Sequence, residues 1–104
     1  MNFHPGSANL TQGSSIALAN VAETLSTCTH RNLVISAHTD NEGPAAQNAE
    51  LSRQRARQVA QFLARRGVSM SRIRAVAYGE SQPIESNTTP NGRRLNRRVE
   101  LTVQ

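Results

Sequence analysis

The strongest constraint on the fold is that the spacing of hydrophobic residues changes several times along the chain. Apolar residues recur at helical spacing in some segments and form short strand-like runs in others. The helical segments are residues 15–26 and 48–66, and the strand-like runs are residues 33–37, 72–78 and 98–103. Helices that alternate with strands predict an α+β domain of two layers, in which helices pack on one sheet.

Several residues support these limits. Gly67 directly follows the second helix, where a left-handed residue commonly ends a helix. Residues 81–90 include Pro90 at their end and are expected to lack regular structure. The run 98–103 alternates strictly between apolar and polar residues, which is typical of a strand. Its apolar residues are expected to share one face of the sheet, namely Val99, Leu101 and Val103.

Length and charge limit the class of protein. A chain of 104 residues suits one domain, and we assign residues 1–104 to a single one. The twelve basic residues are all arginines and oppose seven acidic residues, which gives a net charge of +5. No apolar run approaches the roughly 18 residues of a membrane span, so we expect a soluble domain whose link to a membrane lies in a segment outside this chain. The single cysteine, Cys28, excludes an internal disulfide.

Arg55 is unusual because its position in the second helix directs it toward apolar residues. On a helical wheel of about 100° per residue with Leu51 at zero, Arg55 lies at about 40° and Asn48 at about 60°, within the apolar stripe. A guanidinium that points toward a core needs an acceptor, because burial of an unpaired charge is strongly unfavourable. We therefore expect Arg55 to meet an anionic group.

Asp40 is the nearest candidate for that group. It follows the first strand at its carboxyl end, where open sheets commonly have their ligand sites. Two arrangements remain open from the residues alone. Asp40 and Arg55 either pair with each other, or they are held apart and face one ligand that has both an ammonium and a carboxylate group. Asn48, on the same helix face, could add a neutral hydrogen bond to such a ligand.

The residues around these positions match a family pattern. The matching residues are His38, Thr39, Asp40, Gly43, Asn48, Leu51, Ser52, Arg55 and Ala56. Their order and spacing resemble the GHTD…G…N..LS..RA signature of OmpA-like peptidoglycan-binding domains. Further matches follow in the same order and end with Asn96, Arg97, Arg98, Val99, Glu100 and Leu101. The resemblance covers nearly the whole chain.

The resemblance implies a βαβαβ-type sandwich with a mixed sheet, helices on one face, and an added short helix and strand. It also implies non-covalent binding of peptidoglycan through the diaminopimelate of the stem peptide, which anchors an envelope protein or assembly to the cell wall in the periplasm. By motif position, Asp40 would accept the ligand ammonium and Arg55 would bind its carboxylate. Other residues would line or border the pocket, namely Thr39, Asn48, Leu51 and Arg97. The parent protein would be anchored to the outer or inner membrane.

Two departures from the family pattern change what is expected. Ala37 stands where the family usually has glycine, which alters only the backbone freedom before the loop. His4 follows Phe3 where the family often has an aspartate that helps to hold the ligand ammonium, and an imidazole cannot replace a carboxylate there. The short N-terminus predicts an incomplete first strand. The uninterrupted loop at Gly43 favours the outer-membrane and lipoprotein types over the stator type, and a homodimer is left open.

Metal binding and catalysis are not expected. His38 and Asp40 have no third residue at ligand spacing, so we expect a structural hydrogen bond from His38 and no metal or other cofactor. Neither Ser36 nor Ser52 has a partner triad that would make it a nucleophile, so the chain is not expected to be an enzyme.

The alternative function is that of a basic nucleic-acid-binding module. Its interface would be the arginine cluster at residues 93–98, which comprises Arg93, Arg94, Arg97 and Arg98. We favour a solvated cluster in which one arginine pairs with Glu100 or Asp40. Aromatic residues make up only 3% of the chain, which leaves few platforms for stacking bases, so nucleic acid is not our expected partner.

Overall fold

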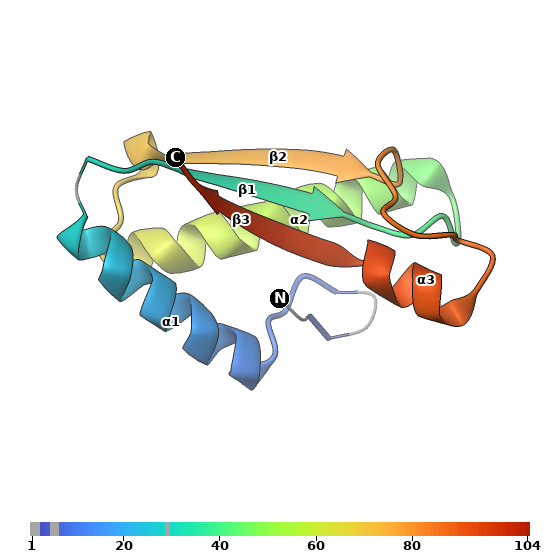
Figure 1. The fold of residues 1–104 in the computed structure, drawn as a ribbon, viewed down its shortest axis with the longest axis horizontal. Helices are drawn as coiled ribbons and strands as arrows, with labels where there is room; N and C mark the ends of the chain where they lie inside the picture. Colours follow the sequence, from blue (N-terminus) through green and yellow to red (C-terminus); the bar gives the residue numbers. More distant parts are fainter. Residues whose placement is uncertain (1–2, 5–6, 29) are drawn as a thin grey trace.

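Three strands form the centre of the fold, in the spatial order β2-β1-β3 (Figure 1). The strands are β1 (Leu33–His38), β2 (Ile73–Gly79) and β3 (Arg98–Val103). β1 pairs in parallel with β2 and antiparallel with β3, so the sheet is mixed, as expected. The structure, a computed structural model, describes residues 3–4, 7–28 and 30–104.

The main helices pack on one face of this sheet. They are α1 (Gln12–Thr27) and α2 (Ala45–Arg65), while the short α3 (Pro90–Asn96) leads into β3 (Figure 1). α2 is the crossover between the parallel strands and packs along both of them, and α1 packs on α2. Buried side chains from both layers form one core, which consists of Leu18, Ala22, Leu25, Leu33, Ile35, Ala37, Ala56, Val59, Ala60, Leu63, Val68 and Val99.

Helix ends follow the local sequence. Thr11 caps α1 by accepting a hydrogen bond from the backbone N–H of Ser14. α2 ends at Arg65, and Gly67 has a φ of 96°, the left-handed conformation predicted for the residue after the helix. There the N–H groups of Gly67 and Val68 donate to the carbonyls of Ala64 and Leu63, each at 3.1 Å. This is the Schellman arrangement, which satisfies carbonyls that the helix leaves free.

The predicted helices and strands are all present, with small shifts at their ends. The expectation for Pro90 was wrong in part, because Pro90 does not close the loop but occupies the first turn of α3, behind a Thr89 cap. A proline has no N–H to lose at that position, so it favours the start of a helix. A short 3-10 turn at Met70–Arg72 also precedes β2.

The predicted apolar face of β3 is buried only at one end. Val99 is buried, whereas Val103 is 52% exposed although it pairs with the buried Leu33. Val103 lines an open groove together with Val21, Leu25 and Cys28, so its side chain is only partly covered.

The described residues of the N-terminal segment contribute an isolated antiparallel bridge between Phe3 and Leu10, and both side chains pack against the core. None of the helices in the described ranges has the length and apolar character needed to cross a membrane.

Candidate functional site

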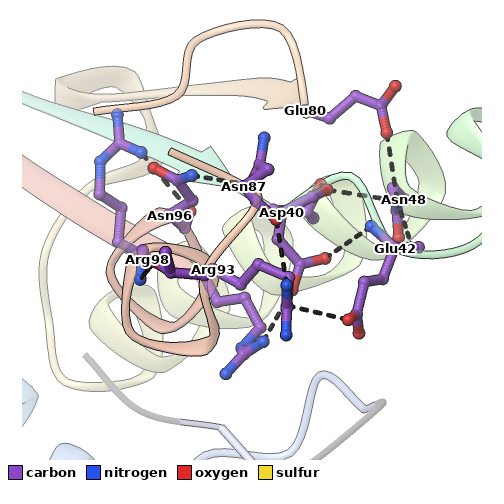
Figure 2. A network of polar contacts seen from close by, with 12 residues as sticks. Asp40, Glu42, Asn48, Glu80, Asn87, Arg93, Asn96 and Arg98 are labelled. Atoms are coloured by element: carbon purple, nitrogen blue, oxygen red, sulfur yellow. Dashed lines mark hydrogen bonds and ion pairs between the residues drawn. The ribbon is translucent and has the colours of Figure 1, made fainter. Parts of the chain in front are cut away.

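A polar network lies where β1 and β2 end, close to the start of α2 and to α3 (Figure 2). Asp40 directly follows β1 and is buried. Its Oδ1 accepts the backbone N–H of Glu42 at 3.1 Å, and its Oδ2 accepts Nη1 of Arg97 at 2.7 Å. The Asp40 side chain is 8% exposed and that of Arg97 is 44% exposed. The ion pair therefore joins a buried carboxylate to a guanidinium group near the surface.

Backbone contacts fix the loop that presents Asp40. The N–H of Thr39 donates to the carbonyl of Gly79 at 2.8 Å, and Oγ1 of Thr39 donates to the carbonyl of Asp40 at 2.9 Å. Gly79 has a φ of 58°, and a Cβ there would lie 3.3 Å from Cα of Ala49. Its N–H donates to Oγ of the buried Ser52 at 3.1 Å. A glycine is thus required where β2 passes α2.

Asn48 holds this loop with its side-chain amide. Its Nδ2 donates to the carbonyl of Glu42 at 2.9 Å, to the carbonyl of Asp40 at 3.3 Å and to Oε2 of Glu80 at 3.4 Å (Figure 2). The prediction placed Asn48 beside a ligand. In the structure its donor group is occupied by the loop, so its observed contacts position the Asp40 loop.

Arg55 is buried, as the helical wheel predicted, with 7% of the residue exposed. Its Nε donates to the carbonyl of Ser7 at 2.9 Å, and its guanidinium lies 5.0 Å over the ring of Phe3. Among the described residues no carboxylate forms an ion pair with it. The buried Asp40–Arg55 pair is therefore absent from this structure, and Asp40 pairs with Arg97 instead.

The charges of this site influence one another. Burial lowers the pKa of Arg55, the nearby positive charge of Arg97 lowers it further, and the negative charge of Asp40 opposes both effects. Two arginines here stand against one aspartate, so the cluster of Asp40, Arg55 and Arg97 has one positive charge in excess. Such a cluster favours an additional carboxylate.

The arginine cluster at residues 93–98 is used within the fold. Arg93 pairs with Glu42 at 2.9 Å and Arg98 with Glu100 at 2.7 Å, while Arg94 donates to Oδ1 of Asn91 at 2.7 Å. Together with the Asp40–Arg97 contact, these pairs confirm the expectation that an arginine of the cluster meets Glu100 or Asp40. All four guanidinium groups thus have protein partners.

Asn96 belongs to the network although no role was predicted for it from the sequence. It is fully buried, and its Oδ1 accepts the N–H groups of Ile84 and Glu85 at 2.8 and 3.0 Å. Its Nδ2 donates to the carbonyl of Glu85 at 2.9 Å and to Oδ1 of Asn87 at 2.8 Å (Figure 2). It therefore ties the loop before α3 to the helix. The sequence signal for this role was the position of Asn96 beside Arg97 in the family motif.

The other predicted site residues lie apart from the network. Leu51 is half-buried on α2, one turn before Arg55. His4 is exposed, and its backbone N–H donates to the carbonyl of Asn9 at 2.8 Å. The neighbouring Phe3 covers Arg55, a contact that the sequence pattern does not reveal.

The prediction for His38 needs a correction. Its ring is buried and stacks on Tyr78 with centroids 5.0 Å apart, but Nδ1 has no hydrogen-bond partner. Burial and the charge of Arg98 lower the pKa of His38, against a smaller opposite effect of Glu100. Stacking on Tyr78 accounts for the ring position, and no hydrogen bond of Nδ1 contributes to it. No group of three potential metal ligands occurs within the described residues.

Comparison with known sequences gives consistent relatives. The model of the OmpA family matches residues 2–97. Outer membrane porin F of Pseudomonas fluorescens is 46% identical over 85 residues, which are 82% of this chain and 26% of the porin. Peptidoglycan-binding protein ArfA of Mycobacterium bovis is 45% identical over 86 residues, which are 83% of this chain and 26% of ArfA. The chain spans about a quarter of the length of these relatives.

Solved structures show the same fold. The peptidoglycan-associated lipoprotein from Burkholderia pseudomallei has a TM-score of 0.88 and 26% identity, over 100% of this chain and 86% of that chain. The C-terminal domain of Helicobacter pylori MotB has a TM-score of 0.87 and 22% identity, over 98% of this chain and 81% of that chain. At that identity the MotB domain supports the fold alone.

Proposed function

The chain belongs to the OmpA family, and from this membership and the geometry around Asp40 we propose that it binds peptidoglycan non-covalently. The proposed ligand group is the free amino-acid end of diaminopimelate in the stem peptide. Asp40 accepts its ammonium and Arg55 binds its carboxylate. The relative ArfA, which is named as a peptidoglycan-binding protein, supports peptidoglycan as the polymer that is bound. The charges of the site residues support the amino-acid end of diaminopimelate as the group that they contact.

The observation that supports this proposal best is the state of Arg55. Its guanidinium is buried at a site with an excess positive charge, and no carboxylate of the described residues neutralises it. A ligand carboxylate would supply the missing anion through a charge-assisted contact worth about 1.5–3 kcal/mol. Arginine suits this role because its planar fork can bind both carboxylate oxygens.

The proposed role of binding is anchoring. We propose that the domain attaches a longer envelope protein to the cell wall from the periplasm, and that it does so without catalysis. The porin and lipoprotein relatives support an envelope location, since their names place them at the outer membrane or describe them as lipoproteins. Which assembly the domain anchors is a property of the longer protein.

Two charge-removing substitutions test the site. Asp40→Asn keeps an oxygen for the N–H of Glu42, and Arg55→Gln keeps a donor for the carbonyl of Ser7. We expect each to weaken binding of meso-diaminopimelate, measured by calorimetry, and of purified peptidoglycan, measured by co-sedimentation, by at least about tenfold.

Arg57→Gln is the matched control, because Arg57 is exposed on the same helix. It removes the same positive charge as Arg55→Gln and should leave calorimetric affinity nearly unchanged. Circular dichroism should confirm that all three variants are folded. If folded Asp40→Asn and Arg55→Gln proteins bind like wild type, the site is wrong.

A further inference from the structure

The ion pair between Asp40 and Arg97 places a positive group where the proposed ligand ammonium would bind. We propose that Arg97 is a specificity-determining residue that exchanges partners during binding. The ligand ammonium displaces Arg97 from Asp40, and the released guanidinium joins Arg55 on the ligand carboxylate. This inference rests on the proposed function of the site and adds a requirement that both ligand groups be present.

Asp40 offers an ammonium little exposed surface beside its present contacts. Oδ1 is engaged by the N–H of Glu42 at 3.1 Å, and Oδ2 by Nη1 of Arg97 at 2.7 Å. The side chain is 8% exposed, so little of the carboxylate is open to a new partner. The contact with Glu42 is part of the loop backbone. Arg97 is therefore the contact that a ligand can replace.

The side chain of Arg97 can move without disturbing the fold. It caps the C-terminus of α3, where its backbone N–H donates to the carbonyl of Arg93 at 3.1 Å. Its side chain is 44% exposed and, among the described residues, forms an ion pair with Asp40. Release of the guanidinium thus breaks a side-chain contact at the surface and leaves the helix end in place.

The second half of the exchange follows from the charges. Asp40 alone offsets two neighbouring arginines, and the positive charge of Arg97 contributes to the lowered pKa of Arg55. Once an ammonium takes Asp40, Arg97 loses its anion, while the ligand brings a carboxylate to the adjacent Arg55. A carboxylate can accept two guanidinium groups because its two oxygens offer about four acceptor positions. The exchange then leaves every charge with a partner.

The exchange predicts an unusual selectivity. A ligand that has the ammonium but a neutral amide in place of the carboxylate must displace Arg97 and offers it no new anion. A zwitterionic ligand also displaces Arg97 from Asp40, but its carboxylate gives Arg97 a new anionic partner. The site should therefore discriminate strongly against stem peptides in which the free carboxylate of diaminopimelate is amidated.

The variant Arg97→Gln distinguishes an exchange of partners from a simple contact between Arg97 and the ligand. The probes are the stem tetrapeptide L-Ala-γ-D-Glu-meso-diaminopimelate-D-Ala, with a free amino-acid end, and the same tetrapeptide with the carboxylate of that end converted to a carboxamide. We expect Arg97→Gln to bind the free tetrapeptide about three- to tenfold more weakly than wild type, because a charge-assisted contact is lost. It should bind the amidated tetrapeptide more tightly than wild type, because the competitor for Asp40 is gone.

The decisive result is that Arg97→Gln changes the two affinities in opposite directions. Calorimetry with both tetrapeptides on the wild-type and variant proteins measures these changes. Arg94→Gln is the control, because Arg94 is an exposed arginine of the same cluster that contacts Asn91 and not Asp40. It should change neither affinity. In wild-type protein, the side-chain Nε–H signal of Arg97 should also shift in NMR spectra on saturation with the free tetrapeptide, which tests the exchange independently of any variant.

Two results would overturn the proposal in different ways. If Arg97→Gln weakens both tetrapeptides equally, or changes neither, Arg97 does not exchange, although peptidoglycan binding still stands. If wild-type protein binds neither tetrapeptide, the proposed function itself fails and the exchange fails with it.

Discussion

At the scale of single residues, Arg55 shows how a small domain keeps a charged side chain under its surface. The ring of Phe3 lies against the guanidinium, and the carbonyl of Ser7 accepts its Nε–H. Both contacts stabilise a cation, since the face of an aromatic ring and a carbonyl oxygen are negative. Neither neutralises its charge. The residue is therefore held in place and still available to an anion.

His38 gives a pH dependence of stability. Burial lowers its pKa from the usual 6.5, Arg98 adds repulsion, and Glu100 opposes them. The unfolded chain, in which the pKa is ordinary, therefore binds the proton first as the pH falls. The contribution of neutral His38 is fully present above pH 6.5 and is lost as the pH falls from 6.5 through the lower pKa of the folded state. Urea titrations at about pH 7.5 and about pH 5 measure this loss.

His38→Phe should keep the ring against Tyr78 and remove this part of the pH dependence. His30→Gln is the control, because His30 is exposed and should leave the dependence as in wild type. Equal loss of stability toward acid in His38→Phe and wild type would show that other groups cause it.

The residues of the site were predictable to different degrees. The burial of Arg55 followed from helical periodicity, because its neighbours on the wheel are apolar. Its partners did not follow, since Phe3 and Ser7 lie far away in sequence and meet α2 only in the folded chain. An arginine of the cluster at residues 93–98 was expected to pair with Glu100 or Asp40, but the sequence did not indicate that Arg97 would be the one to meet Asp40. Geometry between segments decided it.

At the scale of elements, two helical glycines should respond oppositely to alanine. A Cβ on Gly92 in α3 would lie 1.9 Å from the backbone oxygen of Ser86, so α3 or the loop before it must move. A Cβ on Gly13 in α1 would have no atom within 4 Å. Alanine is favoured over glycine in helices by up to about 1 kcal/mol. We expect Gly13→Ala to raise the free energy of unfolding and Gly92→Ala to lower it by at least about 2 kcal/mol.

Urea denaturation of the two alanine variants measures these changes, and each serves as the other's control. If Gly92→Ala is as stable as wild type, the loop that Asn96 holds is less rigid than its hydrogen bonds indicate. Peptidoglycan binding of Gly92→Ala should fall as well, because the same loop and helix position Arg93 and Arg97.

Periodic segments were the elements that could be predicted best. α2 has several helical turns of apolar spacing and a glycine at its end, and β3 has strict alternation, so local sequence determines both. α3 is too short for periodicity to show, and its first residue, Pro90, is also typical of loops. Its start depends on the Thr89 cap and on the contacts of Asn96, which are clear only in the folded structure.

At the scale of the whole molecule, Arg72 joins parts that are distant in sequence. It lies just before β2 and donates to three carbonyls around the end of α1, from Nε to Arg31 at 2.8 Å, from Nη1 to Leu25 at 2.9 Å and from Nη2 to Cys28 at 2.5 Å. A cation is also favourable at a helix C-terminus. Arg72 therefore fastens α1 to the sheet at the end opposite the Asp40 network (Figure 1).

Arg72→Lys should lower the free energy of unfolding by about 1–3 kcal/mol, because one ammonium cannot match three carbonyls spread around a planar fork. Arg74→Lys is the control, since Arg74 is exposed on β2. Chemical denaturation compares the two, and equal stability would mean that the contacts of Arg72 contribute little. Because this anchor is remote from Asp40, affinity for meso-diaminopimelate should change little in the folded Arg72→Lys protein.

The contact between Asp40 and Arg97 joins residues 57 positions apart, and that between Arg55 and Ser7 joins residues 48 apart. Under the proposed function, a nascent chain that emerges from its N-terminus has Asp40 and Arg55 long before it has Arg97. The complete set of proposed ligand contacts thus requires the chain to extend at least to the start of β3. A copy that ends before Arg97 would lack the residue that exchanges partners, so the selectivity of the proposed site would be the last of its properties to be completed.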